Sequence, residues 1–104
     1  MMKMENKLEP EDCSGIEDIR REIDYLDKAV ITLLGKRYEY VLEASKFKIS
    51  KTSVRAPERF NEVLKKRREW AVDVGLNGDV ISNLFRDLVN HFIGEEMKRW
   101  ESNV

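Results

Sequence analysis

Apolar residues recur at every third or fourth position over the stretch from about Ser14 to Phe47. The apolar positions in this stretch are Ile16, Ile19, Ile23, Leu26, Val30, Leu33, Leu34, Val41 and Ala44. This spacing places them on one face of an α-helix. The pattern therefore predicts a single very long helix, with Ser14 as its N-terminal cap.

The same spacing predicts two further helices in the second half of the chain. One begins at Pro57, which suits a first helical turn, and ends at Gly75. Its apolar stripe consists of Phe60, Val63, Leu64, Trp70, Ala71 and Val74. The other follows the turn Asn77-Gly78-Asp79. Its inner side carries Ile81, Leu84, Phe85, Leu88, Val89, Phe92 and Trp100.

The stretch from Ser50 to Ala56 interrupts the helical pattern. It is polar, contains the β-branched residues Thr52 and Val54, and precedes a proline, which disfavours helix in the residue before it. We therefore expect a mobile connection in this place. No β-hairpin pattern occurs, so the expected fold class is all-α, with three helices of which the first is very long.

The length of the first helix implies a partner chain. Roughly 35 helical residues span about 50 Å, which exceeds the diameter of a globule of this size. Two shorter helices cannot cover such a long apolar face. We therefore expect a homodimer in which two chains pair their long helices.

The composition narrows the classes of partner and compartment. A chain of 104 residues has room for one domain, residues 1–104, in which we expect residues 1–12 to be flexible. The 19 basic and 20 acidic residues nearly cancel, so neither nucleic acid nor a membrane is an expected partner. With Cys13 alone there is no internal disulfide, and a single His argues against the common metal sites. No signal peptide or membrane-spanning run is recognisable, and a cytoplasmic location is expected.

Three charged residues fall on apolar faces. At about 100° per residue, Arg37 lies within the stripe of the first helix, and Lys48 lies on the same line three turns later. In the last helix, Glu96 lies within about 40° of the line through the apolar positions. Buried cations need a partner, so Arg37 and Lys48 predict an anion in the interior, such as a compact dicarboxylate ligand.

Periodicity alone leaves a second interpretation open. Glu96 could pair with Arg37 or Lys48 as a purely structural buried ion pair. The criterion also selects Arg67, which is centred on its own stripe and can extend its charged end to solvent. His91 lies on the outer side of its helix, and Cys13 has no nearby His, so neither is a candidate catalytic residue.

From about Pro10 to Trp100 the chain resembles the all-helical chorismate mutase family, and most closely its isochorismate pyruvate lyase branch. The segments that carry this resemblance are Pro10-Glu11-Asp12-Cys13, Asp18-Ile19-Arg20, Ile23-Asp24, Asp27, Arg37, Lys48, Ala56-Pro57-Glu58-Arg59 and Glu95-Glu96. Two of them, the opening Pro-Glu-Asp-Cys and the Ala-Pro-Glu-Arg segment, are similar to the lyase branch in particular. So are Ala56 and Phe60, which stand where the typical mutase carries acids.

The resemblance implies an intertwined homodimer in which Arg20 of one chain completes the site of the other. In this scheme Arg20, Arg37 and Arg59 bind the substrate carboxylates, while Lys48 and Glu96 hydrogen-bond the ether oxygen. Residues 49–56 would then form a lid loop. On the first helix Arg20 lies about 100° from the apolar stripe, so it faces a different neighbour.

The implied function is the conversion of isochorismate to salicylate and pyruvate, with secondary chorismate mutase activity. Both reactions are pericyclic and need neither metal nor cofactor, because the enzyme only holds a reactive conformer and stabilises charge on the breaking C–O bond. Salicylate often enters siderophores, which bind iron. The chain departs from the lyase pattern at Glu96, where glutamine is usual and where only a protonated glutamate can donate a hydrogen bond.

Two other functions are considered beside the lyase. The first is a monofunctional chorismate mutase, which makes prephenate in the same kind of pocket. The second is a non-enzymatic helical dimerisation module, which composition alone would favour. That module gives no reason for Arg37, Lys48 and Glu96 to fall on apolar faces, so we favour the enzyme.

Overall fold

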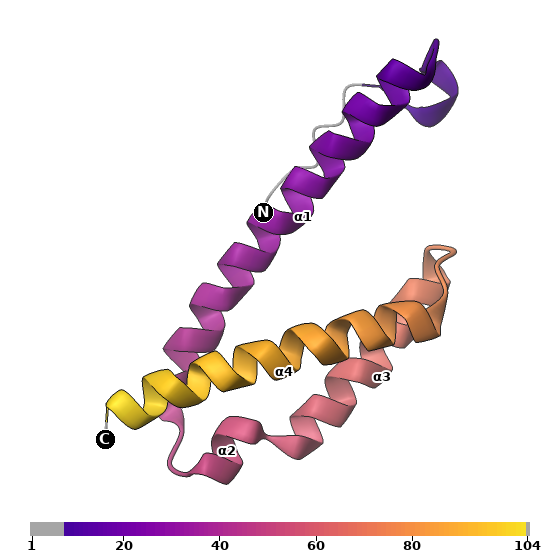
Figure 1. Ribbon diagram of the computed structural model, residues 1–104. Coiled ribbons are helices and arrows are strands. Elements are labelled where there is room, and N and C mark those ends of the chain that lie inside the picture. The colour runs from indigo at the N-terminus through magenta and orange to yellow at the C-terminus, as the bar shows by residue number, and fades with distance from the viewer. Residues whose placement is uncertain (1–7, 104) are drawn as a thin grey trace. The chain divides into compact units, whose positions relative to one another are not determined.

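A computed structural model describes residues 8–103 (Figure 1). In chain order the elements are the 3-10 turn η1 (Pro10–Asp12), α1 (Ile16–Ala44), the 3-10 turn η2 (Ser45–Phe47), α2 (Lys51–Arg55), α3 (Pro57–Asp73) and α4 (Gly78–Ser102). No strand occurs between residues 8 and 103, and the expected all-α class with a very long first helix is confirmed.

The chain divides into two compact units whose boundary falls within α1. The first unit ends at Tyr38 and holds η1 and most of α1. The second begins at Glu39 and holds the last turns of α1 and all later elements. Of the stretch 1–12 that was expected to be flexible, residues 1–7 lie outside the described residues, and Pro10–Asp12 form η1.

The first helix begins two residues later than Ser14. The carbonyl of Gly15 accepts from the Ile19 N–H at 3.3 Å, which makes Gly15 the cap and places Ser14 one residue before it. Ser14 still stabilises the helix start, because its N–H and its hydroxyl donate to Asp18 Oδ2 at 3.0 and 2.8 Å. These bonds, led by the backbone one, lower the pKa of Asp18.

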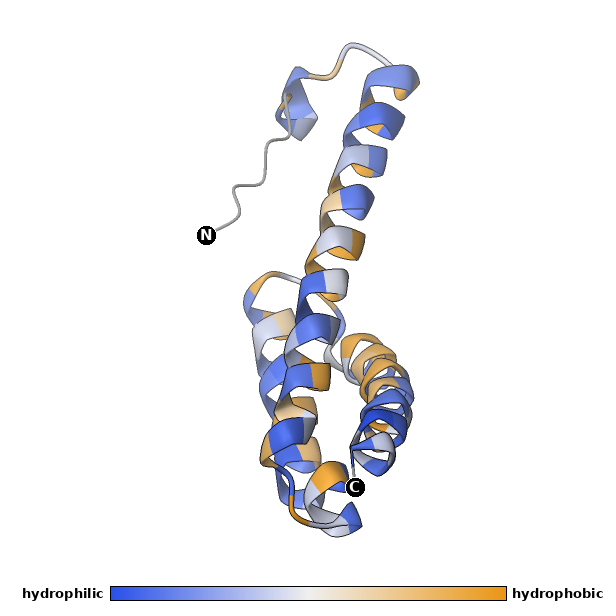
Figure 2. Ribbon diagram, turned by 90° about the vertical axis from the view of Figure 1, so that its left-hand side faces the viewer, coloured by the Kyte–Doolittle hydropathy of each residue, from blue (hydrophilic) through white to orange (hydrophobic). Residues whose placement is uncertain are grey.

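None of the apolar stripe on α1 is buried in the single chain. Ile23 and Val30 are about half exposed, at 49% and 53%, and the only buried residue of α1 is Glu22. Coloured by hydropathy, α1 shows apolar and polar positions recurring along its length (Figure 2). The helix is therefore amphipathic, as its sequence predicted, but its apolar side lacks cover within one chain.

The segment from Ser50 to Ala56, which we expected to be a mobile connection, contains the short helix α2. Ser50 caps it, since its side chain accepts from the Ser53 N–H while Ser53 Oγ accepts from the Ser50 N–H. Val54 anchors it in the core at 1% exposure. The restriction imposed by Pro57 falls on Ala56 alone, which is left-handed with φ 41° and ψ 64°. The five residues of α2, which precede Ala56, are therefore free to be helical.

Helices α3 and α4 lie side by side and antiparallel in the second unit (Figure 1). Gly75 turns the chain with a φ of 82°, and the Asn77 side chain caps α4 by accepting from the Val80 N–H at 3.1 Å. The buried apolar residues of this unit are Val54, Val63, Ala71, Val89 and Phe92.

Several residues of the predicted apolar stripes are not buried in the single chain. Trp70 and Leu84 are each 54% exposed, and Val74 is 73% exposed. Ser82, which was not placed on a stripe, is 1% exposed. The buried face of α4 therefore includes Ser82. A small residue at this position permits the close approach of a neighbouring helix.

Within residues 8–103, no helix is both long and apolar enough to cross a lipid bilayer.

Candidate active site

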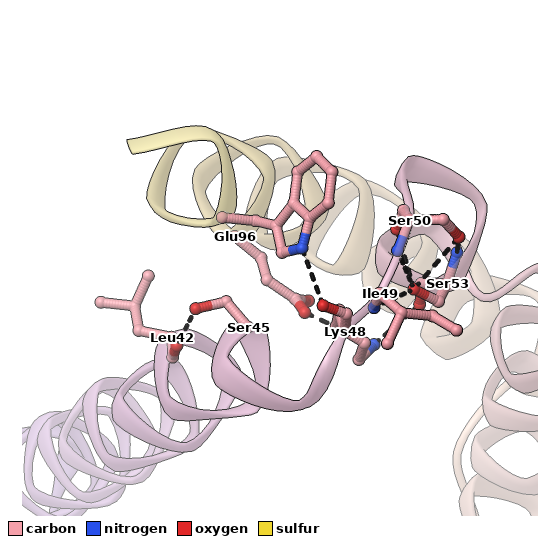
Figure 3. Close-up of polar contacts among 8 residues, drawn as sticks. Leu42, Ser45, Lys48, Ile49, Ser50, Ser53 and Glu96 are labelled. Carbon is pink, nitrogen blue, oxygen red and sulfur yellow. Dashed lines mark hydrogen bonds and ion pairs between the residues drawn. The ribbon is translucent and has the colours of Figure 1, made fainter. Parts of the chain in front are cut away.

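Lys48 and Glu96 meet in the second unit. The Lys48 ammonium lies 3.4 Å from Glu96 Oε2, and the side chains are 24% and 6% exposed. Lys48 is the extended residue that follows η2, with φ −93° and ψ 137°, whereas Glu96 projects from α4. Figure 3 shows the carboxyl group of Glu96 directed at Lys48. Glu96 lies on the buried face of α4, as its spacing predicted. Lys48 does not continue the helical line of Arg37, because α1 ends at Ala44 and the backbone of Lys48 is extended.

The Lys48 ammonium has a second partner in α2. Its Nζ donates to the backbone carbonyl of Ser53 at 2.9 Å (Figure 3). In a continuous helix that carbonyl would accept from the N–H four residues later, but this residue is Pro57, which has none. The break between α2 and α3 thus leaves an acceptor that faces the lysine.

The Lys48 backbone is held by Trp100. The indole Nε1 donates to the Lys48 carbonyl at 2.9 Å, which is the bond drawn from the indole ring in Figure 3. Sequence analysis treated Trp100 only as a packing residue. The signal that could have found it is its spacing of four residues from Glu96, which puts both on one face of α4.

Burial sets the protonation of Glu96. Desolvation raises the pKa of this carboxyl, and the nearby Lys48 charge opposes that rise without cancelling it. Oε2 is buried and accepts no well-aligned hydrogen bond within the part of the chain that the structure describes. Glu96 therefore keeps its proton to higher pH than an exposed glutamate, and in that form its hydroxyl can donate to an oxygen of a ligand.

The three arginines that were predicted to bind the substrate are on α1 and α3. Arg59 lies on α3, is exposed, and pairs with Glu62 at 3.0 Å. No ion pair or hydrogen bond joins Arg59 to Lys48 or Glu96 within residues 8–103. Arg20 is exposed and pairs with Glu17 at 3.7 Å, and Arg37 is half-buried on α1. Both of these lie in the first unit, and their roles stay predictions.

The environments of His91, Arg67 and Cys13 give none of them a catalytic role. His91 is exposed, as predicted. Arg67, the expected false positive of the stripe criterion, lies over the ring of Trp70 at 4.7 Å and that of Phe85 at 5.8 Å. Burial raises the pKa of the free Cys13 thiol, which disfavours the nucleophilic thiolate.

The described chain is all-α and holds the Lys48 ammonium against the desolvated carboxyl of Glu96. Residues 19–97 match the family model for chorismate mutase type II. The chain therefore belongs to the chorismate mutase type II family, which is a family of enzymes.

Individual relatives agree with this assignment. The chain is 41% identical over 91 residues to an isochorismate pyruvate lyase from Pseudomonas aeruginosa, a match that covers 88% of this chain and 90% of the lyase. It is 34% identical over 83 residues to the T-protein of Haemophilus influenzae, covering 79% of this chain and 22% of that protein. A T-protein of Enterobacter agglomerans is 36% identical over 69 residues, which is 65% of this chain and 18% of the relative.

Proposed function

We propose that this protein is an isochorismate pyruvate lyase that converts isochorismate to salicylate and pyruvate, with secondary chorismate mutase activity. The observation that carries the chemistry is the Lys48–Glu96 contact at 3.4 Å. The preference for the lyase reaction is supported by the 41% identity that extends over 90% of the Pseudomonas aeruginosa lyase.

The two residues suit a reaction in which a C–O bond breaks. As the ether bond of isochorismate breaks, a hydrogen moves from the ring to the departing enolpyruvyl group, which leaves as pyruvate while the ring becomes salicylate. Negative charge builds on the ether oxygen during this step. An ammonium group and a protonated carboxyl, held in place by the fold, stabilise that charge by hydrogen bonding.

Arginines complete the proposed site. Arg37 and Arg59 bind the substrate carboxylates, since the planar guanidinium holds a carboxylate in a fixed orientation. Arg20 reaches the substrate from a second chain. Residues 49–56, which contain α2, close over the bound substrate, and Arg55 at the end of α2 moves with them.

The proposed assembly is a homodimer in the cytoplasm. Its support is the exposed apolar side of α1, a helix of 29 residues that is about 44 Å long. A surface of that length is covered when two copies pack their α1 helices together. Salicylate made in this compartment is then available for siderophore synthesis.

A monofunctional chorismate mutase is the second candidate. The observation that favours it is Glu96, because some members of the family carry glutamate there whereas glutamine is usual in the lyases. The two reactions would use the same Lys48–Glu96 pair, so only the products separate them.

The deciding experiment supplies isochorismate and chorismate separately and follows salicylate fluorescence and loss of chorismate absorbance. We expect salicylate well above the spontaneous rate, and loss of that activity in Lys48→Ala. Lys46→Ala is the matched control, because Lys46 is exposed and pairs with Glu43 on the surface. Chorismate loss without enzymatic salicylate would identify a mutase. If neither substrate is turned over, the result would favour a non-enzymatic dimerisation module.

A further inference from the structure

Lys48 is restrained at both its ends. Its ammonium lies between Glu96 Oε2, at 3.4 Å, and the Ser53 carbonyl, at 2.9 Å. Its backbone N–H donates to Ser45 at 3.3 Å, and its carbonyl accepts from Trp100 at 2.9 Å. The Lys48 N–H is therefore bonded to η2 and the Lys48 carbonyl to α4, so the extended backbone of Lys48 connects these two elements.

The two α4 residues that touch Lys48 are in helical register. Glu96 and Trp100 are four residues apart, so they lie one turn apart on the same face. One rigid helix therefore fixes the distance between the group that binds the lysine carbonyl and the group that faces its ammonium. Without the indole bond the Lys48 backbone is held only through its N–H, and any shift of that backbone would move the side chain relative to Glu96.

We propose that Trp100 is a positioning residue, whose indole N–H holds the Lys48 backbone so that the ammonium is delivered to Glu96 and to the substrate oxygen. The effect on turnover rests on the proposed function, but the effect on the Lys48–Glu96 contact does not. Trp100 does not itself touch the reacting atoms, because it acts through the lysine backbone.

Few other charges bear on Glu96 within the second unit. The charged residues of α2, Lys51 and Arg55, are exposed, and Lys48 is the charged group that affects the pKa of Glu96. On α4 itself, Glu95 pairs with Lys98 on the surface. Burial has the largest effect on the pKa of Glu96, and the approach of Lys48 lowers that pKa.

The test compares Trp100→Phe with the unmodified protein by titrating the Glu96 side chain in carbon-13 NMR, with the signal assigned through Glu96→Gln. Loss of the indole donor loosens Lys48, so we expect the pKa of Glu96 to rise towards its value in Lys48→Met. Trp70→Phe is the matched control, because Trp70 is an exposed tryptophan on α3, and it should leave the pKa unchanged.

The double variant separates positioning from general packing. In the Lys48→Met background, Trp100→Phe should produce no further change in the pKa of Glu96. Replacement of Trp100 by benzothienylalanine, which exchanges the N–H for sulfur at nearly constant shape, repeats the test if the phenylalanine variant folds poorly. An unchanged pKa in both Trp100 variants, or an equal shift in the Lys48→Met background, would overturn the proposal.

Kinetics give an independent readout. We expect kcat for salicylate formation to fall about three- to tenfold in Trp100→Phe, which is the range for one lost hydrogen bond, with little change in KM. A rise in KM at constant kcat would contradict positioning of a group that acts in the transition state. If the pKa of Glu96 shifts as expected while the unmodified protein turns over neither substrate, the positioning role stands and the proposed function fails.

Discussion

At the scale of single residues, the environment of Glu96 decides what the site can do. A glutamine donates a hydrogen bond at any pH, whereas a glutamate donates one only when protonated. Glu96 is 5% exposed and faces the Lys48 ammonium across 3.4 Å. Since burial outweighs that attraction, the carboxyl is displaced towards the form that can replace glutamine.

Activity should therefore depend on pH through Glu96. The pKa of this group lies above the usual value for glutamate, so the protonated fraction grows as pH falls through that raised pKa. We expect kcat to rise below neutral pH in the unmodified protein and to be flat in Glu96→Gln. Measuring kcat from mildly acidic to mildly alkaline pH checks this. A flat profile for the unmodified protein, with substrate binding constant, would count against the role of Glu96.

The residues of the site were only partly predictable. Glu96 could be found because a charge on an apolar face is visible in the helical spacing alone. Lys48 was selected by extending the first helix past Ala44, where α1 ends. The search for charges on apolar faces also selected Arg67. The guanidinium of this residue lies over two aromatic rings, a contact that the spacing of residues in the sequence does not reveal. Trp100 was missed because its spacing of four residues from Glu96 shows a shared helix face but not which backbone carbonyl the indole N–H bonds.

At the scale of elements, the existence of the long helices followed from sequence and the short helix did not. Pro57 opens α3 as predicted, whereas α1 ends at Ala44 instead of Phe47, and α4 already includes Gly78 and Asp79 of the predicted turn. We expected no helix before Pro57, because proline disfavours helix in the residue that precedes it. That effect applies to Ala56 alone and does not extend to the residues of α2. Its capping serines and the deeply buried Val54 are sufficient for one short helix.

Removing the cap of α2 should loosen the segment that holds the Lys48 ammonium. In Ser50→Ala the bond from the Ser53 N–H is lost, and we expect α2 to be destabilised by about 1 kcal/mol. Hydrogen exchange at the Val54 and Ala56 amides, which donate to backbone carbonyls within α2, should accelerate about fivefold. Thr52→Ala, at an exposed position, is the control, and equal acceleration in both variants would argue against the cap.

The cap of α4 offers a test of global stability. Asn77→Ala removes the acceptor for the Val80 N–H, and the free energy of unfolding should fall by about 1 kcal/mol. Chemical denaturation measures this change. Asn90→Ala, at an exposed position inside α4, should be close to neutral, so a loss at Asn90 as large as that at Asn77 would contradict the assignment of the cap.

At the scale of the whole molecule, the single chain does not bury the apolar side of its longest helix, α1. The length of α1 could be predicted from periodicity, and the need for a partner followed from comparing that length with the size of one domain. Which residues of two chains meet cannot be read from one sequence, because contacts between copies depend on crossing angle and register.

A charge on the exposed apolar side of α1 should disrupt the proposed dimer. Val30 is 53% exposed in the single chain, and in Val30→Asp an unpaired carboxylate would be buried on association. We expect light scattering after size exclusion to show a shift from dimer to monomer, with a lower melting temperature. Lys28→Asp places the same charge at an exposed polar position and should remain dimeric. Unchanged mass in Val30→Asp would exclude this face as the interface.

The break that Pro57 makes between α2 and α3 also has a consequence for the number of bonds that the substrate can form. An ammonium carries three N–H donors. Within residues 8–103, one is donated to the Ser53 carbonyl that Pro57 leaves without a helical partner, and one is directed at Glu96. One donor remains, which is the number that a single ether oxygen requires. The substrate can therefore complete the coordination of Lys48 without displacing either protein group, and binding need not begin by breaking a bond within the enzyme.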